Sequence, residues 1–184
     1  IPYTTYNSKL YFLLGVDRST RELTDFGGGK KATESMIEAA LRELNEESCK
    51  IFDGIVTLEQ LKFSPVVTTK DKTIAIFFVR VDPKWIDIAE KTFLENQQKF
   101  QDIKKYNELV GVKWVEQERF KLIAFDRRSH CMWKRIQNIL RWNTTWADLH
   151  ITLVLSSELT SALHNSWNYF SNGLELVTRG ILVR

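Results

Sequence analysis

The chain has 184 residues, 43% of them hydrophobic and 27% charged, which is typical of a globular protein large enough to bury its own core. Its 26 basic and 23 acidic residues leave a net charge of +3, too small to indicate nucleic-acid binding without a concentrated basic patch. Two widely separated cysteines and three scattered histidines argue against a zinc cluster or a disulfide framework and favour a cytoplasmic setting. The apolar runs are far shorter than the roughly 18 residues of a membrane span, so no membrane partner is expected.

The first half of the chain predicts a strand, a glycine turn, a helix and a hairpin. The run KLYFLLGVD at 9–17 is rich in apolar and aromatic residues, as strands are. A helix is expected from about Ser35 to Glu47, because Ser35 and Glu38 have capping-box spacing and apolar residues recur on one face. The runs LEQLKFSPVVTT (58–69) and TIAIFFVRVD (73–82), separated by the polar KDK, are typical of two strands joined as a hairpin.

The second half predicts a helix over 84–106, a strand over 111–116 and a second helix over about 129–141. The run LHITLVL at 149–155 is expected to be a strand, and SSELTSALHNSWNYF at 156–170 a helix. No repeat, linker or low-complexity segment divides the chain, so residues 1–184 are expected to form one domain. The mixture of helices, strands and a hairpin predicts an α+β fold.

Three glutamates are expected to share one face of the helix over 35–47. At about 100° per residue, Glu43, Glu46 and Glu47 fall at positions i, i+3 and i+4. Like charges at this spacing destabilise a helix by a few tenths of a kcal/mol per pair. A divalent cation would offset that repulsion, and Mg²⁺ prefers hard oxygen ligands of this kind.

Three consecutive glycines, Gly27, Gly28 and Gly29, precede this helix. Glycine allows a ligand to approach the backbone closely, and a helix N-terminus offers free N–H groups to an anion. Separately, a glycine turn and a glutamate-rich helix face have plainer interpretations, as a simple loop and a solvated surface. Together they predict a site for a metal-bound pyrophosphate.

The spacing of these residues resembles the Nudix box, G-x5-E-x7-R-E-U-x-E-E-x-G-U, in which U is aliphatic. Cys49 and Lys50 depart from the final glycine and aliphatic positions, with Ile51 one place late, and Phe26 stands where a proline often precedes the glycines. The matching positions are Gly28, Glu34, Arg42, Glu43, Leu44, Glu46 and Glu47. The resemblance implies an α/β/α sandwich around a mixed sheet, with a core at about 9–141, a helical insertion at about 84–106 and a C-terminal extension at 142–184.

The resemblance further implies hydrolysis of a pyrophosphate bond in a nucleoside diphosphate derivative, with Mg²⁺ or Mn²⁺ as cofactor. The substrate would be a dinucleoside polyphosphate, a nucleotide sugar or an mRNA cap. Glu43 and Glu47 would be the principal metal ligands, joined by the backbone carbonyl of Gly27. Glu46 would be a further ligand or the general base. Arg42 and Glu34 would orient the other side chains.

Some members of the family take their general base from a later loop, for which Glu108 is the candidate here; the plainer interpretation is a surface residue. Gly28 and Gly29 are expected to contact the substrate. Lys30 and Lys31 would meet additional phosphates, if they are not simply solvated. The alternative to an enzyme is a non-catalytic Nudix-fold module that binds or regulates through a nucleotide or RNA.

A basic helix at 127–141 is the surface on which RNA would bind, with Trp142, Trp146, Trp167 and Tyr169 available to stack on bases. The alternative is a packed helix with a solvated basic face and aromatic residues in the core. The basic side chains are Arg127, Arg128, Lys134, Arg135 and Arg141. A homodimer would use the helix at 84–106 and the C-terminal extension.

Overall fold

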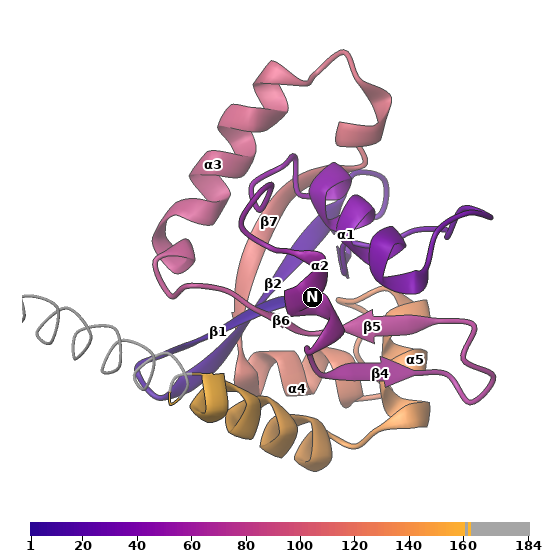
Figure 1. The fold of residues 1–184 in the computed structure, drawn as a ribbon, viewed down its shortest axis with the longest axis vertical. Helices are drawn as coiled ribbons and strands as arrows, with labels where there is room; N and C mark the ends of the chain where they lie inside the picture. Colours follow the sequence, from indigo (N-terminus) through magenta and orange to yellow (C-terminus); the bar gives the residue numbers. More distant parts are fainter. Residues whose placement is uncertain (161, 163–184) are drawn as a thin grey trace, which may run out of the picture.

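The computed structural model, which describes residues 1–160 and 162, is an α+β fold built on a five-stranded mixed sheet (Figure 1). The central strand is β2 (Lys9–Asp17). One edge of β2 pairs with β7 (Leu109–Glu116). Along the other edge, the first part of β2 pairs with β1 (Pro2–Tyr6) and the last part pairs with β3 (Leu23–Thr24). These pairs are antiparallel, and β6 (Val79–Arg80) pairs parallel to β1, which makes the sheet mixed.

Successive residues of β2 supply two separate cores, as the period of a strand requires. Leu10, Phe12 and Leu14 are buried on one face of the sheet, and Leu13 is buried on the other. Helices therefore cover both faces of the sheet.

On the face of Phe12 lie α4 (Gln117–Phe125), α5 (Lys134–Asn143) and a helix over 146–160. The separate two-stranded hairpin of β4 (Val66–Thr68) and β5 (Ala75–Phe77) contributes to the same core and packs beside α5. This layer therefore joins the hairpin to the three helices.

On the face of Leu13 lie α1 (Met36–Glu47), α2 (Leu58–Lys62), α3 (Trp85–Lys99) and the short 3₁₀ helix η1 (Lys104–Tyr106). Leu44 anchors α1 in this core, where it lies with Phe52 and Phe93. Glu47 is buried near Leu44 on α1, whereas Glu43 and Glu46 are only partly buried.

Several predicted elements are confirmed. The strand at 9–17 is β2, the capped helix is α1, the strand at 111–116 is the greater part of β7, and a hairpin flanks KDK. The helix expected at 84–106 ends at Lys99 and is followed by η1, and the helix expected at 129–141 begins only at Lys134. The sequence patterns missed β1, β3 and α4.

The strand predicted at 58–69 was wrong in its first part, and the strand predicted at 149–155 was wrong throughout. Residues 58–62 form α2, because Thr57 and Gln60 make a capping box in which each side chain accepts a hydrogen bond from the other residue's backbone N–H. Residues 149–155 are helical, because Thr145 Oγ1 accepts from Asp148 N at 3.2 Å and Leu149 and Leu153 are buried one helical turn apart. Most of the helix predicted at 156–170 lies outside the described residues. Over the described part of the chain, no helix combines the length and the hydrophobicity needed to cross a membrane.

Candidate active site

Helix α1 is fixed at both ends by local hydrogen bonds. At its start, Ser35 Oγ accepts from Glu38 N at 3.2 Å, and Glu38 Oε2 accepts from Ser35 N at 2.7 Å. At its end, Cys49 and Lys50 take left-handed backbone conformations with φ values of 52° and 61°. Lys50 N donates to Asn45 O at 2.7 Å, which closes the helix as a C-terminal glycine motif does. Cys49 therefore adopts the left-handed turn that the Nudix pattern assigns to glycine.

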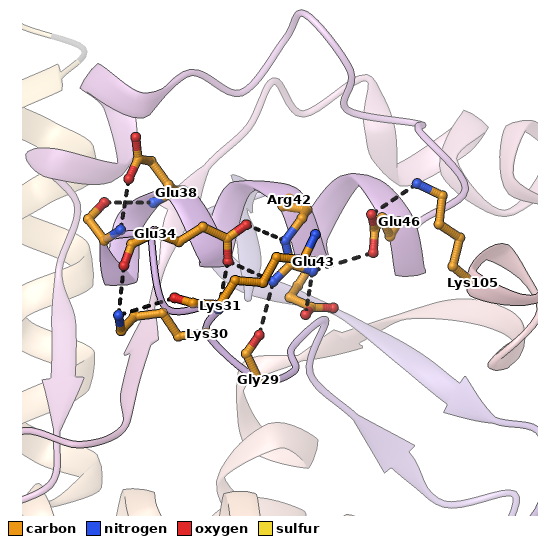
Figure 2. Close-up of polar contacts among 10 residues, drawn as sticks. Gly29, Lys30, Lys31, Glu34, Glu38, Arg42, Glu43, Glu46 and Lys105 are labelled. Carbon is orange, nitrogen blue, oxygen red and sulfur yellow. Dashed lines mark hydrogen bonds and ion pairs between the residues drawn. The ribbon is translucent and has the colours of Figure 1, made fainter.

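The side chain of Arg42 connects the middle of α1 to the glycine loop (Figure 2). Its Nε and Nη2 bind the two carboxylate oxygens of Glu34 at 2.6 and 3.0 Å, in a bidentate pair. Nη2 also donates to Gly29 O at 3.0 Å, and Nη1 donates to Glu43 Oε1 at 2.6 Å. Arg42 thus binds both Glu34 and Glu43, and the orienting roles expected of Arg42 and Glu34 stay a prediction. The Arg42 guanidinium lowers the pKa of Glu34 to about 2, which keeps Glu34 ionised.

Two glutamates one helical turn apart lie against two consecutive glycines. Glu47 Oε2 accepts a hydrogen bond from Gly27 N at 2.8 Å. A methyl group at Gly28 would sit only 2.5 Å from Glu43 Oε1, so the absence of a side chain there makes room for the carboxylate. The glycine loop and the acidic face of α1 therefore form one continuous surface.

Glu47 is the most buried of these carboxylates, with an exposed fraction of 9%. Desolvation by burial raises its pKa to about 8, against the lowering effect of the hydrogen bond from Gly27 N. The negative charges of Asp25, Glu43 and Glu108 raise the pKa further. Glu108 is exposed, and its role as a later base stays a prediction.

Asp25 is a carboxylate that the sequence patterns did not single out. It stands two residues before Gly27, is partly buried, and has a pKa raised mainly by desolvation. Its place directly before Phe26 and the glycines was the available signal. Asp25 adds a further acidic side chain to the surface formed by Glu43 and Glu47.

Glu46 makes a different set of contacts from its neighbours. Its Oε1 binds Lys105 Nζ at 3.0 Å and its Oε2 lies 3.4 Å from Arg42 Nη1. Figure 2 shows the Glu46 side chain directed toward Lys105, which belongs to η1. Lys105 was not expected at the site, because only the tertiary fold brings η1 beside α1. Of the two candidate bases, Glu46 is held by cations, whereas the Glu108 side chain makes no hydrogen bond or ion pair within the described part of the chain.

A cavity of about 300 Å³ lies beside the glycine loop and is lined by Asp25, the three glycines and Glu43. Residues of the β4–β5 hairpin also line it, most of them apolar, among them Ile74 and Ile76. Lys30 and Arg135 also line it. Lys30 Nζ donates to Glu34 O at 2.8 Å, whereas Lys31 is exposed and does not line the cavity. The predicted glycines and Lys30 thus meet at one cavity with Glu43.

The donor chemistry of this surface suits a hard divalent cation. Carboxylates of Glu43 and Glu47 and the backbone of Gly27 offer oxygen atoms, and Mg²⁺ needs only one or two carboxylates when water and substrate phosphates complete its shell. Over residues 1–160 and 162, however, no group of three or more His, Cys, Asp and Glu side chains is assembled as a metal site. Glu43 instead binds Arg42, and Glu47 binds Gly27. A cation would therefore compete with these hydrogen bonds.

The basic residues predicted to lie on one helix do not all share a helix in the structure. Arg127 and Arg128 precede α5 in a turn, and Arg128 binds Asp126. Trp146 packs against Phe12 and Phe120, in the core role that was the alternative. Trp142 is 70% exposed, and Trp167 and Tyr169 lie outside the described residues.

A scan against models of known protein families found no match, and neither did searches of curated proteins or of solved structures.

Proposed function

We propose that the protein is a Nudix-type pyrophosphohydrolase that cleaves a nucleoside diphosphate derivative with the help of Mg²⁺ or Mn²⁺. The observation that carries this proposal is the contact between the acidic face of α1 and the glycine loop, at Glu43 with Gly28 and at Glu47 with Gly27. Glu43 and the glycines also line the cavity, whereas Glu47 does not. Gly28, Glu43 and Glu47 of the Nudix pattern take part in this contact, and Arg42 and Glu34 hold Glu43 beside it. The layers of helices on both faces of a mixed sheet are compatible with a Nudix fold.

Each residue has a chemical role in this proposal. Glu43, Glu47 and the Gly27 carbonyl would hold the cation, and the bound metal would lower the pKa of a water and neutralise charge on the phosphates. Arg42 holds the Glu43 carboxylate in place through its bidentate anchor on Glu34. The glycines let the substrate phosphates approach the backbone.

Glu46 and Glu108 are the two side chains that would accept the proton of the attacking water. Glu46 must first be released from Lys105, because a carboxylate bound to an ammonium is a weaker base. Glu108 needs no such release. The proposal therefore favours Glu108 as the base and Glu46 as a supporting ligand.

The test is phosphate release from a panel of nucleoside diphosphate derivatives, capped RNA and inositol pyrophosphates, with Mg²⁺ and with Mn²⁺. Activity should require the cation and should fall by about 100-fold or more in Glu47→Gln and Glu46→Gln. Glu90→Gln changes an exposed glutamate on α3 and is the matched control, which should keep full activity. Circular dichroism should show all three variants folded.

The alternative is a Nudix-fold module that binds a nucleotide without cleaving it. The observation in its favour is that Arg42 and Lys105 neutralise Glu43 and Glu46 within the protein itself. If the wild-type protein releases no phosphate from any member of the panel but binds one of them tightly, this alternative replaces the enzyme.

A further inference from the structure

A groove of about 810 Å³ adjoins the cavity at the turn between β4 and β5. Thr73 and Ile74 line both depressions, so they form the boundary between them. The far wall of the groove is the end of α5, at Arg141 and Trp142. A ligand longer than the cavity can therefore continue across the turn into the groove.

The charged side chains of the groove favour an anion. Lys70 is exposed in the β4–β5 turn, and Arg141 lies partly buried in the last turn of α5. The carboxylate of Asp71 also lines the groove, but its Oδ1 accepts hydrogen bonds from Thr69 Oγ1 at 2.6 Å and from Thr73 Oγ1 at 2.9 Å. Asp71 thus shapes the turn, and the groove is lined by two cations and one carboxylate.

Basic residues continue along the cavity that the groove adjoins. Lys30 and Arg135 line the cavity, and Arg135 stands two helical turns before Trp142 on α5. Arg141 is held by a hydrogen bond from its Nη2 to Asn138 Oδ1 at 3.2 Å. Four basic side chains therefore line the two depressions, together with the carboxylates of Asp25, Glu43 and Asp71. Lys70 and Arg141 are the cations available to a phosphate backbone in the groove.

The side chain of Trp142 gives the groove an aromatic surface. Its residue is 70% exposed, whereas Trp146, four residues later, packs in the core. An exposed indole beside lysine and arginine is the combination with which proteins hold single-stranded nucleic acids, by stacking on a base while cations follow the backbone.

We propose that this groove binds a single-stranded oligonucleotide, with a base stacked on Trp142 and a phosphate beside Lys70. The inference deepens the proposed function and rests on it in one respect: the pyrophosphate to be cleaved would lie at the glycine loop, and the rest of the oligonucleotide would pass Thr73 and Ile74. The surface differs from the basic helix expected from the sequence, because Arg127, Arg128 and Lys134 do not line the groove. Lys70, from the β4–β5 turn, lines the groove instead.

The first experiment measures binding without chemistry. Fluorescence anisotropy of a short labelled RNA, and of the matching DNA, is followed over a range of salt concentrations in the absence of divalent cations. Trp142→Ala should weaken binding by about 5- to 100-fold, and Trp142→Phe should restore most of it because phenylalanine still stacks. Lys70→Gln should weaken binding and reduce the salt slope by about 0.7, the value of one phosphate contact to a single strand.

Two matched controls separate this groove from general surface effects. Phe63→Ala removes an aromatic side chain that lies outside the groove and is 74% exposed. Lys91→Gln removes an exposed lysine on α3. Both should leave binding unchanged. If Trp142→Ala binds as tightly as the wild-type protein, or if both control variants weaken binding equally, the proposal is overturned. The RNA and DNA arms show which sugar the groove accepts.

The second experiment links the groove to turnover. In Trp142→Ala, kcat/KM should fall about tenfold for an oligonucleotide with a 5′ pyrophosphate and stay unchanged for a nucleotide sugar. An equal fall for both substrates would contradict a separate groove. If no substrate is hydrolysed while RNA binding still depends on Trp142, the proposed enzymatic function fails and the groove stands.

Discussion

The carboxylate of Glu43 lies directly against the backbone of Gly28. A methyl group at Gly28 would meet Glu43 Oε1 at 2.5 Å, whereas a methyl group at Gly29 would meet no atom within 4 Å. Neither glycine has the positive φ that would penalise alanine for its backbone alone. Alanine at position 28 therefore tests whether Glu43 needs the space beside the loop, and alanine at position 29 tests whether the loop needs the flexibility of glycine.

We predict that Gly28→Ala lowers kcat/KM by about tenfold or more, because the loop or Glu43 must move to accommodate the methyl group. Gly29→Ala should lower kcat/KM less, because its methyl group meets no protein atom within 4 Å. Steady-state kinetics on the best substrate of the panel, with melting temperatures for both variants, provide the check. Equal losses in the two variants would show that loop flexibility, and not the fit of Glu43, limits the reaction.

Arg42→Lys should lower kcat/KM by about 10- to 100-fold while leaving α1 folded. Lysine keeps the charge but cannot bind both oxygens of Glu34 and still reach Glu43 and Gly29. Arg127→Lys, at an exposed position, is the control and should have no effect.

The partnership of Arg42 and Glu34 has a second consequence. Because the two side chains act as a unit, Glu34→Gln combined with Arg42→Lys should be scarcely worse than the more damaging single variant. The same kinetic measurement tests this. Strictly additive losses would mean that Glu34 and Arg42 contribute independently.

Glu47 should make the stability of the metal-free protein depend on pH. In the folded state its carboxyl keeps its proton up to about pH 8, whereas in the unfolded chain it ionises near pH 4.5. The unfolded state therefore binds fewer protons over this interval, and the free energy of unfolding should fall as pH rises from 4.5 to 8. Since one unit of pKa corresponds to about 1.4 kcal/mol, we expect a loss of roughly 1 to 4 kcal/mol.

Urea unfolding at pH 5, 6.5 and 8 without divalent cations measures this loss, and Glu47→Gln is the reference because glutamine does not titrate. The variant should lose less stability than wild type over the same interval. Mg²⁺ should restore stability at pH 8, where it can bind the ionised carboxylate, more than at pH 5. Parallel pH profiles for the two proteins would show that Glu47 ionises normally.

The left-handed turn after α1 predicts an unusual order of stability at position 50. Lys50 has a φ of 61° and an exposed side chain, and its Nζ lies 3.7 Å from Asp53 Oδ2. Lys50→Gly and Lys50→Ala both remove that contact, but only alanine keeps a Cβ in the left-handed conformation. The glycine variant should be more stable to urea than the alanine variant by about 1 kcal/mol. The opposite order would mean that the turn is not left-handed.

Sequence patterns predicted the elements whose signals are local and agree with one another. Helix α1 combines a capping box at Ser35 with a periodic apolar face, and both features depend only on residues within a few positions. The strand β2 carries an unbroken apolar run because it is buried between two layers of helices. In contrast, LHITLVL has the composition of a strand but forms a helix, since the buried Leu149 and Leu153 and the cap at Thr145 decide its conformation.

The candidate site divides in the same way. The residues on α1 and in the glycine loop could be assigned because one short segment contains them. Asp25 lies in the same segment but was not singled out. Lys105 and Arg135 could not be assigned, because Lys105 reaches Glu46 across 59 positions of sequence and Arg135 reaches the cavity from the layer on the other side of the sheet. Only tertiary packing brings these side chains to the site.

Calorimetric titration with Mn²⁺ at pH 8 tests the central claim most directly. Wild type and the control Glu90→Gln should take up the ion, and Glu43→Gln and Glu47→Gln should bind it at least about tenfold more weakly, because each removes a charged oxygen ligand. Absence of uptake by the wild-type protein, or equal uptake by all four proteins, would contradict a cation site between α1 and the glycine loop.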